Sequence, residues 1–297
     1  MNEFKSGFVS IIGRPNVGKS TLLNRLIGQK IAIISHKPQT TRNNVLGILS
    51  EENYQIVFTD TPGIHAPATK LGEFMVKSAQ GAMQDADAVL FLVEPKDSIG
   101  KTEEKIMDDL RGKDIPVILV INKIDTIEKE KLFSIISKYT ESFDFEAVIP
   151  ISARHRDGIE LLKEELLKYI PEGPMFYPED MVTDQPERQI TAELIREKLL
   201  YALDKEIPHG VAIEIFAMKE KKNLVEIEAN IYCEKASHKA IIIGKGGEML
   251  KNVGQSARED IEKMVEKKVL LKLWVKVKDG WRNNNYLIKN FGFDRES

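Results

Sequence analysis

The first half of the chain alternates between short apolar segments and longer segments whose apolar residues recur at helical spacing. This pattern predicts strands over residues 8–12, 45–49, 54–59, 88–93, 117–121 and 147–151. It predicts helices over residues 19–26, 71–83, 102–110, 129–139 and 158–169. Such alternation is typical of an α/β domain with a mostly parallel six-stranded sheet and helices on both faces. The second and third strands are separated only by a short turn, so they predict a hairpin with an antiparallel edge strand.

A different pattern follows four closely spaced prolines, at positions 171, 174, 178 and 186. Such a stretch does not continue a helix and is typical of a linker. Beyond it, the pattern predicts helices over 190–203, 237–243 and 250–264 and strands over 211–217, 224–232 and 269–277. The order helix, strand, strand, helix, helix, strand predicts an α+β module. We therefore expect a first domain over residues 1–172, a proline-rich linker over 173–187 and a second domain over 188–297.

Basic and acidic side chains nearly balance over the whole chain, at 43 against 46. The balance is uneven, because residues 235–289 hold 13 basic and 6 acidic side chains, which favours a polyanionic partner for the second domain. The single cysteine, Cys233, excludes an internal disulfide, and the five histidines show no metal-ligand spacing. No apolar segment is long enough to span a bilayer and no signal-peptide core is seen, so we expect a cytoplasmic protein.

Residues 13–20 read Gly-Arg-Pro-Asn-Val-Gly-Lys-Ser between a predicted strand and a predicted helix, which matches the phosphate-binding loop pattern. Glycines let the backbone approach phosphates closely, and the N–H groups at the start of the helix face the anion. The pattern predicts that Lys19 reaches the β- and γ-phosphates and that the Ser20 hydroxyl binds Mg²⁺. The expected nucleotide contacts of this loop are Asn16, Val17, Gly18, Lys19, Ser20 and Thr21.

Two later segments complete a candidate site for magnesium and the γ-phosphate. Asp60 and Gly63 belong to an Asp-Thr-Pro-Gly turn at a strand end, where ligands bind in open sheets. We expect Asp60 to hold Mg²⁺ through water and the Gly63 N–H to sense the γ-phosphate. Residues 38–42 read Pro-Gln-Thr-Thr-Arg, and a threonine there would give Mg²⁺ a second hydroxyl when γ-phosphate is bound. We favour Thr41 over Thr40 for this role.

Residues 122–125 read Asn-Lys-Ile-Asp directly after a buried strand. The Asp125 carboxylate can accept hydrogen bonds from both N1–H and the exocyclic amine of guanine, whereas adenine offers neither donor in that arrangement. The motif therefore predicts selection of GTP over ATP, with Asn122 bracing the loop and Lys123 lying along the base plane. The end of the last predicted strand is expected to contact the guanine oxygen through the backbone of Ser152, Ala153 and Arg154.

Residues 241–247 read Ile-Ile-Ile-Gly-Lys-Gly-Gly between two predicted helices. A Gly-x-x-Gly loop lets a single-stranded backbone approach without a side-chain clash, and helix N-terminal amides favour phosphate. Within this order of elements, the loop is typical of a type II KH domain, whose groove binds unstacked bases. We expect Trp274 and Trp281 to pack rather than to stack on bases. The expected RNA contacts are Ile243, Gly244, Lys245, Gly246, Gly247, Lys251 and Arg258, with Lys239 beside them.

The nucleotide motifs, in this order, resemble the Ras-like P-loop GTPases. Asn16, the Gln-Thr-Thr-Arg segment at 39–42 and the C-terminal Gly-Lys-Gly-Gly loop narrow the resemblance to the Era family, within the TrmE-Era-EngA branch, over essentially the whole chain. The resemblance implies GTP binding and hydrolysis, binding to the 3′ end of 16S ribosomal RNA, and assistance in maturation of the small (30S) ribosomal subunit. It also implies a cytoplasmic monomer with loose contact to the inner face of the membrane. Arg154 stands where the family more often has lysine.

One residue departs from the Ras pattern. Ile64 stands where Ras-type switches carry the glutamine that orients water, so slow hydrolysis without a side-chain base is expected. Catalysis would then depend on positioning by Lys19, Thr41, Gly63 and Asn16 together with Mg²⁺. Related GTPases with this asparagine use K⁺, so we expect K⁺ as a second cation.

Other interpretations stay open at this point. The protein could be a membrane-associated signalling GTPase whose C-terminal domain binds protein or lipid. It could also be a relative of double-domain assembly GTPases whose KH-like domain binds protein, but the single nucleotide site and the intact Gly-x-x-Gly argue against that. In the favoured interpretation, we hypothesise that GTP orders residues 38–42 and 63–74 and so changes RNA binding by the second domain.

Overall fold

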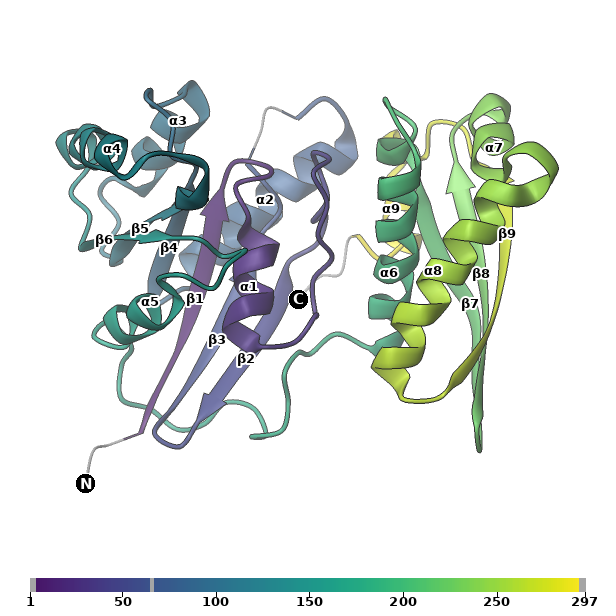
Figure 1. Cartoon of the computed structure of the whole chain (residues 1–297), viewed down its shortest axis with the longest axis horizontal. Coiled ribbons are helices and arrows are strands. Elements are labelled where there is room, and N and C mark those ends of the chain that lie inside the picture. Colours follow the sequence, from purple (N-terminus) through teal and green to yellow (C-terminus); the bar gives the residue numbers. More distant parts are fainter. Residues whose placement is uncertain (1–3, 65–66, 294–297) are drawn as a thin grey trace. The chain divides into compact units, whose positions relative to one another are not determined.

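The computed structural model describes residues 4–64 and 67–293. Contacts divide the chain into two compact units, which are also the two groups of elements in Figure 1. The first unit comprises Met1–Ala32, Thr41–Pro67 and Met75–Asp184, and the second comprises Ile33–Thr40, Ala68–Phe74 and Gln185–Ser297.

The first unit contains a six-stranded sheet in the order β2-β3-β1-β4-β5-β6 (Figure 1). Its strands are β1 (Lys5–Gly13), β2 (Val45–Glu51), β3 (Tyr54–Asp60), β4 (Ala88–Val93), β5 (Val117–Asn122) and β6 (Ala147–Ile151). Neighbouring strands pair in parallel except β2 and β3, which form the expected antiparallel hairpin. Strands β4 and β5 are buried at every position, as continuous apolar strands covered on both faces should be.

Helices cover both faces of this sheet. They are α1 (Lys19–Ile27), α2 (Lys70–Gln84), α3 (Lys101–Leu110), α4 (Lys129–Ser142) and α5 (Ile159–Leu166). Apolar side chains of α1 and α5 pack in one cluster with Val9 and Ile11, and those of α2, α3 and α4 pack in another with Ile12. Since successive strand residues point to opposite faces, β1 contributes to both clusters. The predicted mostly parallel, doubly covered sheet is therefore confirmed.

The strand register brings the sequence motifs to one edge of the sheet. Ile11 of β1 pairs with Asp60 at the end of β3, and Asn122 at the end of β5 pairs with Ile151 at the end of β6. Carboxyl ends of parallel strands meet at the same edge, which is where open α/β sheets bind ligands. The loops after β1, β3, β5 and β6 therefore form one neighbourhood.

The proline-rich segment follows the edge of the first unit closely. Val182 O accepts a hydrogen bond from Ile48 N at 2.9 Å, and Thr183 Oγ1 donates to Leu46 O at 2.7 Å. Nearer its start, the Gln55 side chain donates to Tyr177 O at 2.9 Å. These contacts give residues 177–183 defined partners along β2 and β3.

The second unit contains a three-stranded sheet in the order β7-β8-β9. Its elements are α6 (Glu187–Ala202), β7 (Ala212–Lys221), β8 (Leu224–Cys233), α7 (Ala236–Ile243), α8 (Glu248–Val265), β9 (Lys268–Val277) and α9 (Asn285–Asn290). The pair β7–β8 is antiparallel and β8–β9 is parallel. Side chains of α6, α7 and α8 share an apolar cluster with inward-facing strand residues. The predicted α-β-β-α-α-β order is confirmed, and α9 is an additional helix that the apolar pattern did not predict.

The two tryptophans of this unit lie in different environments. Trp281 is fully buried, and its Nε1–H donates to Gly210 O at 2.9 Å, so the expected packing role is confirmed. Trp274 is 41% exposed, and its ring centroid lies 5.4 Å from that of the exposed Phe216. The packing of Trp274 is therefore an aromatic contact on the outer face of the strand. Its strand position points it outward, while the neighbouring Val275 points inward and is buried.

Candidate nucleotide site and nucleic-acid groove

The loop between β1 and α1 forms a tight cradle. Gly18 has φ 103°, and a Cβ at this position would lie 2.2 Å from Asn122 Nδ2, so only glycine fits. Asn122 in turn donates from Nδ2 to Val17 O at 2.8 Å, while its Oδ1 accepts from Ala153 N at 3.0 Å. Asn122 therefore joins the loop after β1 to the loop after β6, which is the bracing contact expected from the sequence.

Lys19 lies inside this cradle with its ammonium group buried. Its Nζ donates to Gly13 O at 3.2 Å and to Arg14 O at 3.0 Å. Burial lowers the pKa of Lys19 to about 8, although the nearby Asp60 carboxylate acts in the opposite direction. A buried ammonium held by two carbonyl oxygens is poorly compensated, and a polyanion bound in the cradle would compensate it. Thr21, two residues further, is half-buried in the first turn of α1.

Three oxygen-bearing side chains from separate segments meet beside the start of α1. Ser20 Oγ lies 2.8 Å from Thr41 Oγ1 and donates to Asp60 Oδ2 at 2.6 Å. Thr41 Oγ1 also donates to Asp60 Oδ2, at 3.2 Å. Thr40 does not join them, because its hydroxyl donates to Lys37 O at 2.7 Å. The structure thus brings Thr41, rather than Thr40, to Ser20 and Asp60.

One carboxylate oxygen of Asp60 can still accept a hydrogen bond or bind a cation in this cluster. Asp60 is fully buried, and its Oδ1 has no hydrogen-bond partner among the described residues. Burial raises the pKa of Asp60, although Lys19 and the Ser20 and Thr41 hydroxyls act in the opposite direction. A buried, unsatisfied carboxylate oxygen beside two hydroxyls is an arrangement that a hard cation would complete.

The segment after β3 lies against the phosphate loop. Ile64 N donates to Gly13 O at 3.2 Å, and the Ile64 side chain is buried. A Cβ on Gly63 would lie 2.7 Å from the backbone of Pro15, so the two loops are in close contact. Residues 65–66, within the segment expected to respond to GTP, lie outside the described residues, and Lys70–Phe74 form the start of α2.

The loops after β5 and β6 form the far wall of the site. Ser152 Oγ donates to Asp125 Oδ1 at 2.6 Å, and this hydrogen bond holds the pKa of the Asp125 carboxyl below its ordinary value. Lys123 has a left-handed backbone, with φ 67°, and its Nζ donates across the site to Asn16 O at 2.6 Å. Asp125 is therefore an ionised, fixed acceptor, and Lys123 links this wall to the phosphate loop.

Sequence reasoning missed several residues that hold these loops. Arg25 on α1 donates from Nε to Ala153 O at 3.1 Å and from Nη2 to Arg154 O at 3.3 Å. Arg14 pairs through Nε with the buried Glu103 at 2.8 Å, and Glu94 contacts Lys123 at 2.5 Å. Of these residues, only Glu94 could have been proposed from the sequence. It directly follows the buried strand β4, just as Asn122 ends the buried strand β5, so it is expected at the same edge of the sheet.

In the second unit, the Gly-x-x-Gly loop connects α7 to α8 through residues that favour glycine. Gly244, Gly246 and Gly247 all have positive φ, at 75°, 61° and 82°. A Cβ on Gly244 would lie 2.6 Å from Met249 Cβ, whereas Gly246 and Gly247 face open space. The loop therefore presents backbone rather than side chains, apart from the exposed Lys245.

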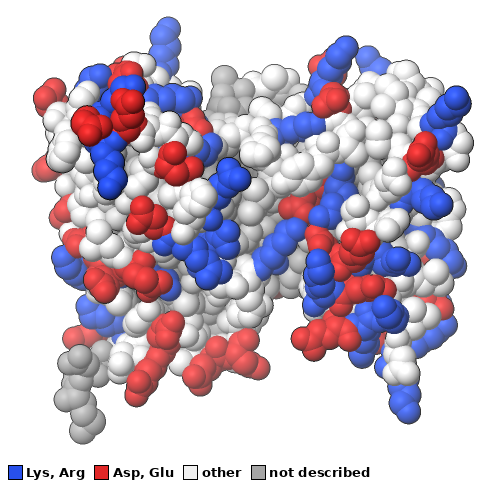
Figure 2. Space-filling view, in the orientation of Figure 1, with Lys and Arg blue, Asp and Glu red and all other residues white. Residues whose placement is uncertain are grey.

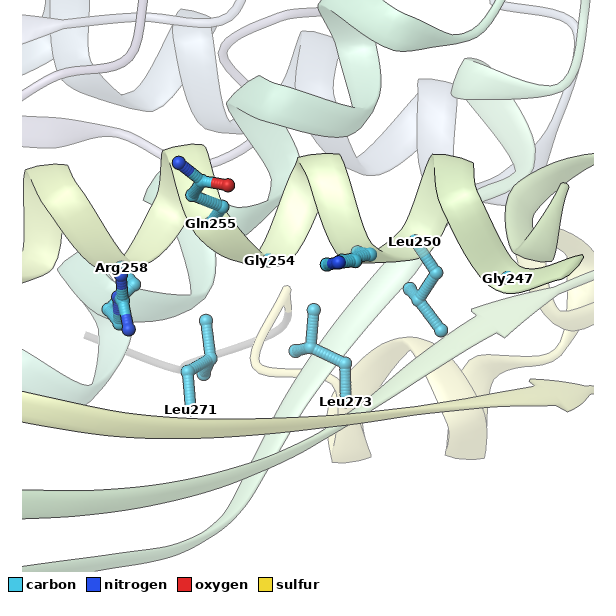
Figure 3. A pocket seen from close by; sticks show the side chains of 8 residues that line it. Gly247, Leu250, Gly254, Gln255, Arg258, Leu271 and Leu273 are labelled. Atoms are coloured by element: carbon cyan, nitrogen blue, oxygen red, sulfur yellow. The ribbon is translucent and has the colours of Figure 1, made fainter.

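A groove of about 530 Å³ begins at this loop and continues between α8 and β9 (Figure 3). In Figure 3, Leu271 and Leu273 point from β9 toward α8, and the Arg258 side chain projects from α8 toward the strand. The lining residues are Gly247, Leu250, Lys251, Gly254, Gln255, Arg258, Leu271 and Leu273. The groove thus combines an apolar floor with two cationic side chains.

The predicted RNA contacts divide into two sets. Gly247, Lys251 and Arg258 line the groove, while Lys245 is exposed on the loop beside it. Ile243 instead packs against the core of the unit, because it ends α7 on its inner side. The five other lining residues were not predicted, since an apolar residue on one strand face carries no signal for binding.

Charge is mixed rather than segregated on the face of the molecule that Figure 2 shows. On the face in Figure 2, Lys and Arg side chains of both units stand among Asp and Glu side chains. Within the described chain, no carboxylate forms an ion pair with Lys245, Lys251 or Arg258. The cations at the groove are therefore available to an anionic ligand. No helix in the described chain has both the length and the apolar character needed to cross a membrane.

Comparisons with known proteins agree with this division into two sites. Residues 8–123 match a family model described as a 50S ribosome-binding GTPase, and residues 206–282 match the KH domain model. Both the nucleotide loops up to β5 and the groove between α8 and β9 fall inside these matches.

Curated relatives and solved structures match the whole chain. GTPase Era of Ruminiclostridium cellulolyticum is 54% identical, with 98% of each chain covered, and GTPase Era of Clostridium botulinum strain 657 is 56% identical, also with 98% of each covered. A structure of Era with MgGDPNP and nucleotides 1506–1542 of 16S ribosomal RNA superposes with a TM-score of 0.96 at 38% identity, covering 98% of this chain and 100% of that one. A variant of Aquifex aeolicus Era bound to GDP and AlF4⁻ gives 0.95 at 38% identity with the same coverage. The chain therefore belongs to the Era family of GTPases.

Proposed function

We propose that this protein is a GTP-hydrolysing switch whose KH domain binds 16S ribosomal RNA near its 3′ end and which assists maturation of the small ribosomal subunit. The observation that carries the first part is the meeting of Ser20, Thr41 and Asp60 beside the buried Lys19. The second part is supported by the groove below the Gly-x-x-Gly loop and by the relative solved with nucleotides 1506–1542 of 16S ribosomal RNA.

The oxygen cluster fits Mg²⁺, which binds through hydroxyl, carboxylate and phosphate oxygens. Ser20 and Thr41 would bind through their hydroxyls, and the unpartnered Asp60 Oδ1 would hold a metal-bound water. When bound, Mg²⁺ neutralises charge that develops on the β- and γ-phosphate oxygens. Lys19 would add its charge at the same phosphates, and the Gly63 N–H would donate to the γ-phosphate from the loop beside Pro15.

The opposite wall would select the base. The Asp125 carboxylate would accept from guanine N1–H and the exocyclic amine, while Ser152 keeps it ionised and oriented. Lys123 would lie along the base plane, since its ammonium is fixed at Asn16 O. The backbone N–H of Arg154 would donate to the guanine oxygen, while the Ala153 N–H holds Asn122 Oδ1 and Arg25 holds the carbonyls of both residues.

Hydrolysis would depend on positioning rather than on a side-chain base. Ile64 is apolar and buried, so it cannot orient water, and Arg14 is directed toward Glu103 by a 2.8 Å contact from Nε. We propose that K⁺, held partly by Asn16, supplies positive charge to the phosphates. GTP hydrolysis should then be at least about tenfold faster in KCl than in NaCl at equal ionic strength, and Asn16→Ala should remove the difference.

The control for this experiment is Asn53→Ala, which changes an exposed asparagine in the β2–β3 turn. Phosphate release would be followed at saturating GTP and Mg²⁺ in both salts. Equal rates in the two salts for the unaltered protein would exclude K⁺ as the second cation.

RNA binding should depend on the bare backbone of the Gly-x-x-Gly loop. Gly246 faces open space with φ 61°, so Gly246→Asp places a carboxylate where an RNA phosphate would lie. We expect at least a tenfold loss of affinity for an RNA with the 3′-terminal sequence of 16S ribosomal RNA, and unchanged GTP hydrolysis. Filter binding and phosphate release measure the two quantities.

The matched control is Gly280→Asp, because Gly280 has nearly the same backbone conformation, φ 59°, and also faces open space. It lies outside the groove, so it should leave RNA affinity unchanged. Unaltered RNA affinity in Gly246→Asp would instead favour a domain that binds protein or lipid, in a GTPase associated with the membrane.

The ribosomal target can be tested without altering the chain. The description of the matching family model names the 50S ribosome, whereas the solved relative is bound to 16S RNA, which belongs to the small subunit. Crosslinking of the GTP-analogue-bound protein to total cellular RNA should give sites at the 3′ end of 16S RNA. Crosslinks confined to large-subunit RNA would overturn the proposed target.

We also propose that the protein is a cytoplasmic monomer that makes loose contact with the inner face of the membrane. Co-sedimentation with vesicles tests the membrane contact.

A further inference from the structure

Glu94 lies directly after β4, and its carboxylate contacts three cationic side chains. Glu94 Oε1 lies 2.5 Å from Lys123 Nζ, and Oε2 lies 2.9 Å from Lys96 Nζ and 3.7 Å from Arg14 Nη2. Burial alone would raise the pKa of the Glu94 carboxyl, but the hydrogen bonds from Lys123 and Lys96 hold it below its ordinary value. Glu94 is therefore ionised at neutral pH and shared among three cations.

These contacts connect the two loops of the nucleotide site. Arg14 belongs to the phosphate loop, and Lys123 belongs to the loop that would face guanine. The Lys123 ammonium is held between Glu94 Oε1 and Asn16 O, at 2.5 Å and 2.6 Å. Its backbone is left-handed, which is unfavourable for a residue with a side chain and persists only where neighbours hold it. Thr126 holds this backbone by donating from N and Oγ1 to Lys123 O, at 3.0 Å and 2.7 Å, while Glu94 and Asn16 O hold the ammonium.

We propose that Glu94 is a positioning residue that slows the release of guanine nucleotide by fixing Lys123, a role that rests on the proposed nucleotide site. A long lysine side chain has many rotamers, and ordering it during binding costs free energy. With its ammonium fixed in advance, the alkyl chain of Lys123 is already extended as a wall for the base. Without Glu94, the ammonium has one carbonyl acceptor and must be ordered by the nucleotide itself.

If Glu94 acted only through its charge, its removal would change the nucleotide dissociation rate in the opposite direction from a loss of Lys123 positioning. Glu94 is an anion near the site of a polyphosphate, so removing its charge alone would strengthen phosphate binding and slow release. Loss of Lys123 positioning would weaken binding and speed release. The sign of the change in dissociation rate therefore distinguishes positioning from electrostatics.

The test is dissociation of fluorescently labelled GDP from full-length Glu94→Gln, with excess unlabelled GDP. We expect release about tenfold faster than from the unaltered protein, while single-turnover hydrolysis of bound GTP stays within about twofold. Glu104→Gln is the matched control, because Glu104 is exposed on α3 and its loss removes the same charge without touching Lys123. Its release rate should be unchanged. Glu94→Asp keeps the charge on a shorter side chain and should give an intermediate rate.

A double-mutant cycle shows whether Glu94 acts through Lys123. Lys123→Met should release GDP faster, and adding Glu94→Gln to it should cause little further acceleration, because the contact is already absent. Unchanged or slower release from Glu94→Gln, or fully additive effects in the cycle, would overturn the proposal. Failure of the unaltered protein to bind GDP would instead overturn the proposed nucleotide site.

Discussion

Asp125→Asn should weaken GTP binding by about 10²–10³-fold and make xanthosine triphosphate the preferred nucleotide. The carboxylate would accept two hydrogen bonds from guanine, and bonds to a charged acceptor contribute about 1.5–3 kcal/mol each. An asparagine amide offers one acceptor and one donor. Xanthine carries an oxygen where guanine has its exocyclic amine, so the new donor gains a partner there. Competition of both triphosphates against labelled GDP measures the change.

The position of Asp125 makes this substitution informative. Ser152 Oγ donates to Asp125 Oδ1 at 2.6 Å, and the same contact can form to the oxygen of asparagine, so the loop should keep its shape. Asp114→Asn is the control, because Asp114 is exposed before β5 whereas Asp125 follows the other end of that strand. Equal GTP affinity in Asp125→Asn, or comparable ATP binding by the unaltered protein, would contradict guanine selection by this carboxylate.

The agreement between sequence and structure is best where one physical rule connects distant segments. Asp60, Asn122 and Ser152 are far apart in the chain, yet each ends or directly follows a strand with an apolar sequence. Parallel strands bring their carboxyl ends together, so the position of these residues at strand ends is enough to predict that they lie close to one another. The glycine loops were predictable for a similar reason, since positive φ and close approach both require glycine at Gly18 and Gly244.

The supporting residues could not be predicted, because their partners are set by packing rather than by local pattern. Arg25 lies 128 positions before Ala153 in the chain. Nothing in the sequence of α1 distinguishes an arginine that contacts a distant loop from one that faces solvent. Helix α9 has only six residues, too few for an apolar period to show, and its start is capped by the Asn284 side chain, which accepts from Leu287 N.

Lys19→Met should reduce GTP hydrolysis by about 10³-fold or more and should also stabilise the nucleotide-free protein. The loss of activity follows from removing the cation that would neutralise the β- and γ-phosphates. The gain in stability follows from burial, which lowers the pKa of Lys19 from 10.5 to about 8 in the nucleotide-free state. Below pH 8 the folded chain carries a buried ammonium at a cost of roughly 3 kcal/mol, which methionine does not have.

The pH dependence provides the sharpest measurement. Between pH 8 and 10.5 the unfolded chain holds more protons at Lys19 than the folded chain, so the free energy of unfolding rises with pH in that window. Denaturant unfolding should show this rise as a difference: across the window, the free energy of unfolding of Lys105→Met, an exposed lysine on α3, should increase relative to that of Lys19→Met. A polyphosphate restores the charged form, so calorimetry at pH 8.5 should detect proton uptake on GTP binding. Binding without proton uptake would mean that Lys19 is already charged in the empty cradle, and then its burial could not account for the affinity of this loop for phosphate.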